Sequence, residues 1–331
     1  MTSPTPGIAR APLGRTDVRV SRLVLGGGPL AGLFAPVDDR VAAGTLEAAW
    51  DSGVRTFDTA PHYGAGLSEE RLGAFLAGKD RSACVVCTKV GRLLVPTDDD
   101  VEGVARFFGA ARRSRVWDFS RDGVRRSLEQ SCERMGLDRV DVALIHDPDD
   151  HWDIAINEAY PALEELRSDG VVSAIGVGMN QTAMLERFVA ETDIDCVLVA
   201  GHYSLLDSSA AESLFPACVA AGVAVLAAGV YQSGILANPR PGAMFNYGAP
   251  PPEITARVSQ IARVCAAHAV PLPAAALHYV TANPAVTAVV VGARSAREAS
   301  ENARHLKTVV PPELFDELAA LGLVAPSISP G

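Results

Sequence analysis

Short apolar, β-branched runs alternate with amphipathic helical stretches along this chain, and the alternation restricts the possible folds more than any other feature. Eight strand–helix units in series imply parallel strands joined by right-handed crossovers. The pattern therefore predicts an α/β fold, either a (β/α)8 barrel or a long doubly wound sheet. The expected strands are 20–25, 56–58, 84–89, 140–146, 172–177, 196–200, 224–228 and 286–291. The expected helices are 40–52, 68–77, 120–135, 157–169, 182–191, 210–221 and 253–283, with a final helical pattern at 296–304.

Residues typical of helix ends agree with these boundaries. Ser120 and Thr182 are suited to cap helix N-termini, because their hydroxyls accept hydrogen bonds from free backbone N–H groups. Glycines, which favour helix C-termini, follow four expected helices, at Gly53, Gly136, Gly170 and Gly222. Two long loops interrupt the rhythm, one from Lys89 to about Trp117 and one from Gln232 to Pro252. In a barrel both would lie at the C-terminal face, where active sites are built.

Composition excludes several classes of function. Lys and Arg number 29 against 39 Asp and Glu, so the formal net charge is −10 and no basic tract marks a nucleic-acid surface. No apolar run approaches the roughly 20 residues that span a bilayer. Residues 1–11 are rich in Pro, Ser and Thr and predict a mobile leader rather than a signal peptide. Residues 12–325 are expected to form a single domain of a cytoplasmic protein, without an interdomain linker.

Six cysteines in a chain this long do not indicate a disulfide framework. Cys84 and Cys87 have the C-x-x-C spacing of redox and metal sites, but they lie in an expected strand. Residues three apart on a strand point to opposite faces, so the pair is predicted to serve packing. We expect no metal site.

Polar residues stand where expected strands end. Asp58 ends the second strand, Lys89 the third and His146 the fourth, and Tyr63 follows Asp58 by five residues. Each has an ordinary structural interpretation, as a helix cap, a solvated loop residue or a buried ring. If the strands are neighbours, however, all four side chains meet at one end of the sheet.

Such a set suits proton transfer coupled to hydride transfer at a carbonyl or alcohol. A tyrosine with the ordinary pKa of about 10 is a poor acid or base at neutral pH. The Lys89 ammonium is expected to stabilise the phenolate and lower the pKa of Tyr63, and Asp58 to keep the lysine charged and oriented. His146 would donate a hydrogen bond to a substrate oxygen.

The chain resembles the aldo-keto reductases over nearly its whole length, from Leu13 to about Asn302. The matching motifs are Asp58-Thr59-Ala60-x-x-Tyr63-Gly64, Ser68-Glu69-x-x-Leu72-Gly73, Thr88-Lys89-Val90 and Asp138-Arg139-Val140-Asp141-Val142-x-Leu144-Ile145-His146. The resemblance implies a single (β/α)8 TIM barrel with long loops on its C-terminal face. It also implies that Tyr63 is the general acid/base, that Lys89 and Asp58 tune it, and that His146 orients the substrate.

The resemblance implies a nicotinamide cofactor whose adenosine end lies after the eighth strand. The residues implied there are Gly292, Arg294, Glu298 and Asn302, around a helix N-terminus that suits a phosphate. Glu298 occupies the position at which NADP-preferring members carry arginine. A carboxylate would repel a 2′-phosphate and suit a ribose hydroxyl, so NAD is expected. NADP is possible if Arg294 or Arg297 compensates.

At the nicotinamide end the motifs depart from most members of the family. Asn180, Tyr203 and Gly234 are the expected contacts, while the usual glutamine and stacking tyrosine are replaced by small residues. These departures resemble the aldose 1-dehydrogenases acting on L-fucose and D-threo-aldoses, with pyridoxal 4-dehydrogenase close by. They imply oxidation of a sugar at C1 to a lactone. The residues expected to line the sugar pocket are His62, Trp117, His151 and Trp152.

Three alternatives are weighed. The glycines Gly26 to Gly28 loosely match a dinucleotide-binding fingerprint, but Pro29 and the following residues do not open a helix, and Asp58 is too distant for the ribose acid. These glycines are instead expected to let backbone approach a cofactor. A non-catalytic cofactor-binding sensor is disfavoured by the intact set of four residues. An NADPH-dependent carbonyl reductase of detoxification or secondary metabolism remains open, and Glu298 argues against it.

Overall fold

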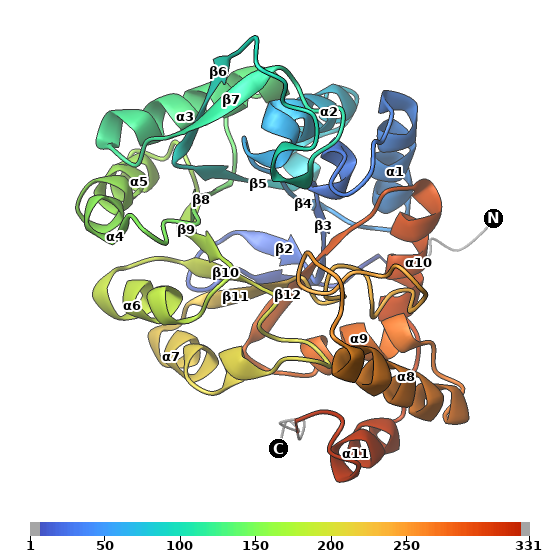
Figure 1. Cartoon of the computed structure of the whole chain (residues 1–331). Helices are drawn as coiled ribbons and strands as arrows, with labels where there is room; N and C mark the ends of the chain where they lie inside the picture. The colour runs from blue at the N-terminus through green and yellow to red at the C-terminus, as the bar shows by residue number, and fades with distance from the viewer. Residues whose placement is uncertain (1–6, 326–331) are drawn as a thin grey trace, which may run out of the picture.

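Eight parallel strands form a closed barrel in the computed structural model, which describes residues 7–325 (Figure 1). The order around the barrel is β10-β11-β12-β3-β4-β5-β8-β9, so consecutive strands along the chain are neighbours. The expected α/β fold is therefore the (β/α)8 barrel and not the doubly wound sheet. The barrel strands are β3 (Leu23–Gly26), β4 (Thr56–Asp58), β5 (Val85–Val90), β8 (Val142–His146), β9 (Ala174–Met179), β10 (Cys196–Ala200), β11 (Ala224–Ala228) and β12 (Val286–Gly292).

Helices surround the barrel (Figure 1). They are α1 (Asp39–Asp51), α2 (Leu67–Leu76), α3 (Arg121–Met135), α4 (Trp152–Ile154), α5 (Tyr160–Ser168), α6 (Ala183–Glu191), α7 (Leu214–Ala221), α8 (Pro252–Ala267), α9 (Leu272–Thr281), α10 (Ala296–Leu306) and α11 (Pro312–Ala320). In the described part of the chain no single helix is long and apolar enough to span a membrane. Only α8 and α9 taken together pass that test, and they are bent by 95°.

Alternate residues of each strand face two separate apolar layers. Leu144 and Leu226 belong to a cluster that fills the barrel interior, whereas Ile145 and Val225 pack against the outer helices. Cys84 lies in the outer cluster and Cys87 in the inner one, and both thiols are free. The prediction that this pair points to opposite faces and serves packing is confirmed.

The first expected strand, 20–25, is divided at Arg22. Its first half is β2 (Arg19–Ser21), which pairs antiparallel with β1 (Arg10–Pro12). The Arg22 guanidinium binds the carbonyls of Thr281, Val286 and Thr287, and so joins the break to the end of α9 and the start of β12. Residues 1–6 of the expected leader lie outside the described residues. The leader boundary at residue 11 is wrong, because Arg10 already belongs to β1.

Several element ends differ from the expectation for local reasons. The expected helix 253–283 is two helices, since Pro271, which has no N–H to donate, stands at the start of α9. Ser120 caps α3 by accepting from the Gly123 N–H at 3.1 Å, as predicted. The Thr182 hydroxyl makes no cap; instead the Gln181 Oε1 accepts from the Met184 N–H. α11 is absent from the expected set.

The long loop after β5 contains a β-hairpin that the sequence pattern does not predict. Its strands are β6 (Arg92–Pro96) and β7 (Arg113–Trp117), paired antiparallel with Leu94 opposite Arg115. In Figure 1 the hairpin extends beyond the barrel at the top of the view. Because β6 begins two residues after β5 ends, the hairpin is held directly above the carboxyl ends of the strands.

Candidate active site

Asp58, Lys89 and Tyr63 form one hydrogen-bonded group at the carboxyl ends of β4 and β5. The Lys89 ammonium donates to both carboxylate oxygens of Asp58 at 2.7 and 2.8 Å, to the Thr59 carbonyl at 3.0 Å and to the Tyr63 hydroxyl at 3.0 Å. Lys89 is only 1% exposed and Asp58 4%. A charged pair this deep requires a saturated hydrogen-bond shell, and these contacts supply it.

Strand register brings the group together. Asp58 lies opposite Cys87 of β5, and Lys89 lies opposite Leu144 of β8, so that both polar residues are near the ends of adjacent strands. The lysine stem passes close to Gly178 of β9, since a Cβ there would lie in ordinary contact with the Lys89 Cε at 3.6 Å. Tyr63 begins a short 3₁₀ turn after β4, which folds its ring back over the lysine.

Burial determines the protonation of this group in a way the sequence did not predict. Although the Tyr63 ring is partly exposed, its hydroxyl is surrounded by protein, and burial raises the pKa of Tyr63 to about 12 despite the nearby Lys89 ammonium. The expected lowering is therefore wrong for the protein without ligands. Burial acts to lower the pKa of Lys89, but Asp58 and Tyr63 outweigh it and raise that pKa. Burial raises the pKa of Asp58 against the effect of Lys89.

Two histidines lie beside the tyrosine. The His146 ring stands perpendicular to the Tyr63 ring at 5.9 Å between centroids, and the His62 ring is 5.8 Å from that of His146. Burial, followed by the nearby Arg92, lowers the pKa of His146 far below its ordinary value and that of His62 to about 2. Both imidazoles are therefore neutral at pH 7, and each carries one N–H donor.

The four residues expected in the sugar pocket do not all gather at this mouth. His62 belongs to it, and Trp117 and His151 pack together on Phe119 next to Arg92. Trp152 lies elsewhere. Its ring packs on Phe188 of α6 and under the Arg187 guanidinium, in the outer helix layer. Its assignment to the pocket is wrong, because α4 carries it away from the strand ends.

The segment after β12 fits the adenosine end of a nicotinamide cofactor. Ser295 caps α10 through the Glu298 N–H, and in the described structure the N–H groups of Ala296 and Arg297 have no acceptor. These free donors and the exposed Arg294 suit a phosphate. The Glu298 carboxylate accepts from the Arg294 N–H at 2.9 Å and lies 3.4 Å from its guanidinium.

Two further expected cofactor contacts have defined surroundings. Asn302 holds the start of this segment, donating to the Gly292 carbonyl and accepting from the Tyr231 hydroxyl. Gly234 has φ +104°, and nothing lies within 4 Å of where its Cβ would be. That open backbone is compatible with a ligand at this loop.

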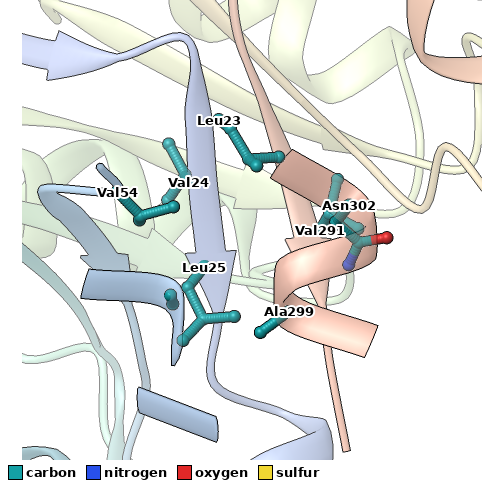
Figure 2. Close-up of a pocket in the computed structure, with 8 residues that line it drawn as sticks. Leu23, Val24, Leu25, Val54, Val291, Ala299 and Asn302 are labelled. Carbon is teal, nitrogen blue, oxygen red and sulfur yellow. The ribbon is translucent and has the colours of Figure 1, made fainter. Parts of the chain in front are cut away.

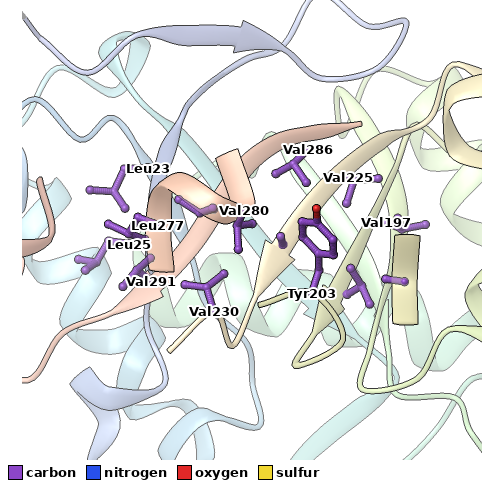
Figure 3. Close-up of a cluster of buried hydrophobic side chains, with 14 of the residues drawn as sticks. Leu23, Leu25, Val197, Tyr203, Val225, Val230, Leu277, Val280, Val286 and Val291 are labelled. Carbon is purple, nitrogen blue, oxygen red and sulfur yellow. The ribbon is translucent and has the colours of Figure 1, made fainter. Parts of the chain in front are cut away.

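Tyr203 does not lie at the nicotinamide end. It is 4% exposed, stacks on Tyr279 and meets Phe215 edge-on, and its hydroxyl accepts from Asn283. Figure 3 shows it within the buried apolar cluster around β11 and β12. The expectation that it lines the pocket is wrong. Asn180 is exposed, and its backbone carbonyl pairs with the His202 ring at 2.7 Å.

Gly27 serves packing in the structure. A Cβ on it would lie 2.3 Å from the Ser68 hydroxyl and 2.9 Å from the Asp58 carbonyl. Its lack of a side chain therefore lets β3, β4 and α2 approach one another.

Figure 2 shows an apolar gap between β3, β12, α1 and α10. Its cavity volume is about 10 Å³, which is the size of a single water probe. It is a packing gap on the outer side of the barrel and not part of the site.

Sequence reasoning missed three charged residues at the mouth. The Arg92 guanidinium donates to Asp147 at 2.7 Å, and Asp147 lies 3.5 Å from the His146 Nε2. Arg115 binds the His62 carbonyl from the hairpin. Asp147 directly follows β8 and Arg92 comes two residues after β5, and both strands were predicted to carry chemistry, so a signal for these two residues was available. Arg115 had no such signal, because its hairpin was not predicted.

Known proteins resemble this chain in both sequence and fold. A family model described as the aldo/keto reductase family matches residues 22–322. The chain is 42% identical to a D-threo-aldose 1-dehydrogenase of a Pseudomonas species, over 98% of this chain and 99% of that protein. It is 36% identical to a pyridoxal 4-dehydrogenase of Microbacterium luteolum, over 95% and 97%. The fold resembles that of an aldo-keto reductase from Bacillus halodurans in its holo form, with a TM-score of 0.77 at 23% identity, covering 97% and 98%.

Proposed function

Because the chain belongs to the aldo/keto reductase family and is an NAD(P)-dependent oxidoreductase, we propose that it oxidises an aldose at C1 to the lactone. The observation that carries this proposal is the 42% identity, over nearly the full length of both chains, to a D-threo-aldose 1-dehydrogenase. A second candidate, oxidation of pyridoxal, rests on the 36% identity to a pyridoxal 4-dehydrogenase.

In the proposed mechanism Tyr63 moves the proton. The nicotinamide cofactor, when bound, supplies the hydride acceptor. The anomeric hydroxyl gives its proton to the Tyr63 phenolate, the C1–H bond breaks with its electron pair, and the C1–O bond becomes the carbonyl of the lactone. Lys89, held charged by Asp58, stabilises the phenolate through its 3.0 Å hydrogen bond. Neutral His146 donates to the same substrate oxygen and aligns it with Tyr63.

An assay of substrates against both nucleotides tests this function. We expect NAD reduction with D-threo-configured aldoses, followed at 340 nm, and weaker turnover with pyridoxal and simple aldehydes. Turnover with pyridoxal alone would favour the second candidate. Nucleotide binding without turnover of any of these substrates would favour a sensor.

We expect the pH dependence of the two directions to differ. Oxidation requires the Tyr63 phenolate, and since the pKa of Tyr63 is raised to about 12, its fraction grows about tenfold per pH unit below that value. The logarithm of kcat/KM for oxidation should therefore rise with a slope of about one from pH 7 to 10. Reduction requires the protonated form and should stay level from pH 6 to 9. A change of slope in either pH profile near pH 6.5 would contradict the neutral state of His62 and His146.

We propose that NAD is the preferred nucleotide and that Glu298 sets the preference. Glu298→Gln should raise kcat/KM for NADP about tenfold relative to NAD, because removing about 1.4 kcal/mol of charge repulsion is worth that factor. Glu301→Gln is the matched control, one turn further along α10, where Glu301 faces Arg297 and Arg304. Equal nucleotide ratios in the wild type and Glu298→Gln would contradict the assignment.

A further inference from the structure

The hairpin places two arginines on one face, above the candidate active site. Leu94 pairs with Arg115 and Arg92 with Trp117, and side chains that pair across strands or alternate along one strand share a face. Arg92 and Arg115 therefore point the same way. Each lowers the pKa of His62, and Arg92 lowers that of Arg115, so the three side chains lie close together.

The two arginines differ in their partners. Arg92 is 7% exposed, donates to Asp147, and packs its guanidinium on the Trp117 ring at 4.1 Å. Arg115 donates only from its Nε, to the His62 carbonyl at 3.1 Å. Among residues 7–325 no carboxylate pairs with Arg115, and its Nη2 is buried without an acceptor. The Arg92 Nε and the His62 Nδ1 are likewise buried and unpartnered.

One cation at the mouth, Arg115, makes no ion pair within residues 7–325; the third carboxylate nearby, Asp149, acts on Arg92 and Asp147. Lys89 is balanced by Asp58 and Arg92 by Asp147, while His62 and His146 are neutral. Arg115 remains without a counterion, half-buried and next to a second guanidinium. Burying a charge without a partner is costly, and like charges add to that cost. An anion bound here would relieve both costs and fill the donor positions that the protein leaves open.

We propose that Arg92, Arg115 and His62, the arginine subsite, bind a carboxylate or phosphate group of the substrate, a few bonds from the carbon that reacts at Tyr63. This deepens the proposed function and rests on it. The His62 and His146 rings lie 5.8 Å apart, so the subsite adjoins the residue assigned to orient the substrate oxygen. An acidic sugar or an aldehyde acid has that form, whereas a neutral aldose would leave Arg115 unsatisfied.

Two pairs of aldehydes test the subsite in the direction of reduction. Succinic semialdehyde is compared with butanal for a carboxylate, and glyceraldehyde 3-phosphate with glyceraldehyde for a phosphate. We expect kcat/KM to be at least tenfold higher for the anionic member of at least one pair, and the pair that shows it identifies the group. Arg115→Gln should bring the ratio of kcat/KM for the anionic member to kcat/KM for the neutral member close to one. Arg112→Gln, the same charge change at an exposed site on the hairpin loop, should keep it.

An equilibrium measurement separates failure of the subsite from failure of the proposed function. Sodium phosphate, compared with sodium chloride at equal ionic strength, should raise the thermal midpoint of the wild type and Arg112→Gln more than that of Arg115→Gln, in which only the phosphate position at the start of α10 is left. The subsite alone is overturned if the enzyme turns over neutral aldehydes and shows no preference for anionic ones. It is also overturned if the preference for anionic aldehydes survives in Arg115→Gln. If no substrate turns over, the proposed function fails, and an equal phosphate shift in all three proteins then overturns the subsite as well.

Discussion

Tyr63→Phe is expected to lower kcat by about 100- to 10,000-fold, the range that a positioned acid/base contributes. The substitution removes one oxygen, which among residues 7–325 is the only side-chain acceptor besides Asp58 that contacts the Lys89 ammonium. Phenylalanine keeps the ring contacts with Phe107 and His146. Nucleotide affinity, measured by quenching of protein fluorescence, should therefore change by less than about twofold.

Tyr160→Phe is the matched control for this experiment. Tyr160 lies in α5, and its hydroxyl contacts Glu164 and the Asp193 N–H at the outer surface. The control should retain full activity and similar stability. Near wild-type turnover by Tyr63→Phe would refute the role assigned to Tyr63, and loss of nucleotide binding together with turnover would indicate a disturbed fold instead.

The hydrophobic periodicity of the sequence locates most strands, but it does not predict that they form a closed barrel. The expected strands at 56–58, 196–200 and 224–228 coincide with β4, β10 and β11, since each is a short buried run between clear helix and turn signals. Such short buried runs occur in closed barrels and in open sheets alike. The prediction of a closed barrel rests on the resemblance to the family. The division at Arg22 was not predictable, because it depends on carbonyls of residues far along the chain.

Site residues were also predictable from the sequence where local features decide their position, and not where contacts with distant residues do. Asp58, Lys89 and His146 were predictable because each ends a strand, and the barrel brings strand ends together. Tyr203 and Trp152 were misplaced because the direction of a loop or short helix decides where an aromatic ring points. The pKa of Tyr63 was predicted in the wrong direction, since the sequence shows the neighbouring ammonium but not the burial that outweighs it.

The first turn of α2 fixes the position of β5 through a buried ionic network. Glu69 is fully buried and accepts from the Thr88 hydroxyl at 2.8 Å and from the Arg134 Nε at 2.7 Å, so that one carboxylate joins α2, β5 and α3. Thr88 directly precedes Lys89 in β5. The neighbouring Ser68 hydroxyl bonds Thr59 and the Gly27 carbonyl, which holds the same turn to β3 and β4.

Glu69→Ala is expected to lower the free energy of unfolding by about 3–5 kcal/mol, because it leaves the largely buried Arg134 guanidinium without its counterion. Glu70→Ala is the control: its ion pair with Arg113 is about one-third exposed and should contribute less than about 1 kcal/mol. Denaturant midpoints, measured by circular dichroism, compare the two. Glu69→Ala/Arg134→Met should recover part of the loss, since it removes the unpaired charge rather than restoring the contact. Equal, small losses in both single variants would show that solvent enters and screens Arg134, and that the network contributes little to holding β5.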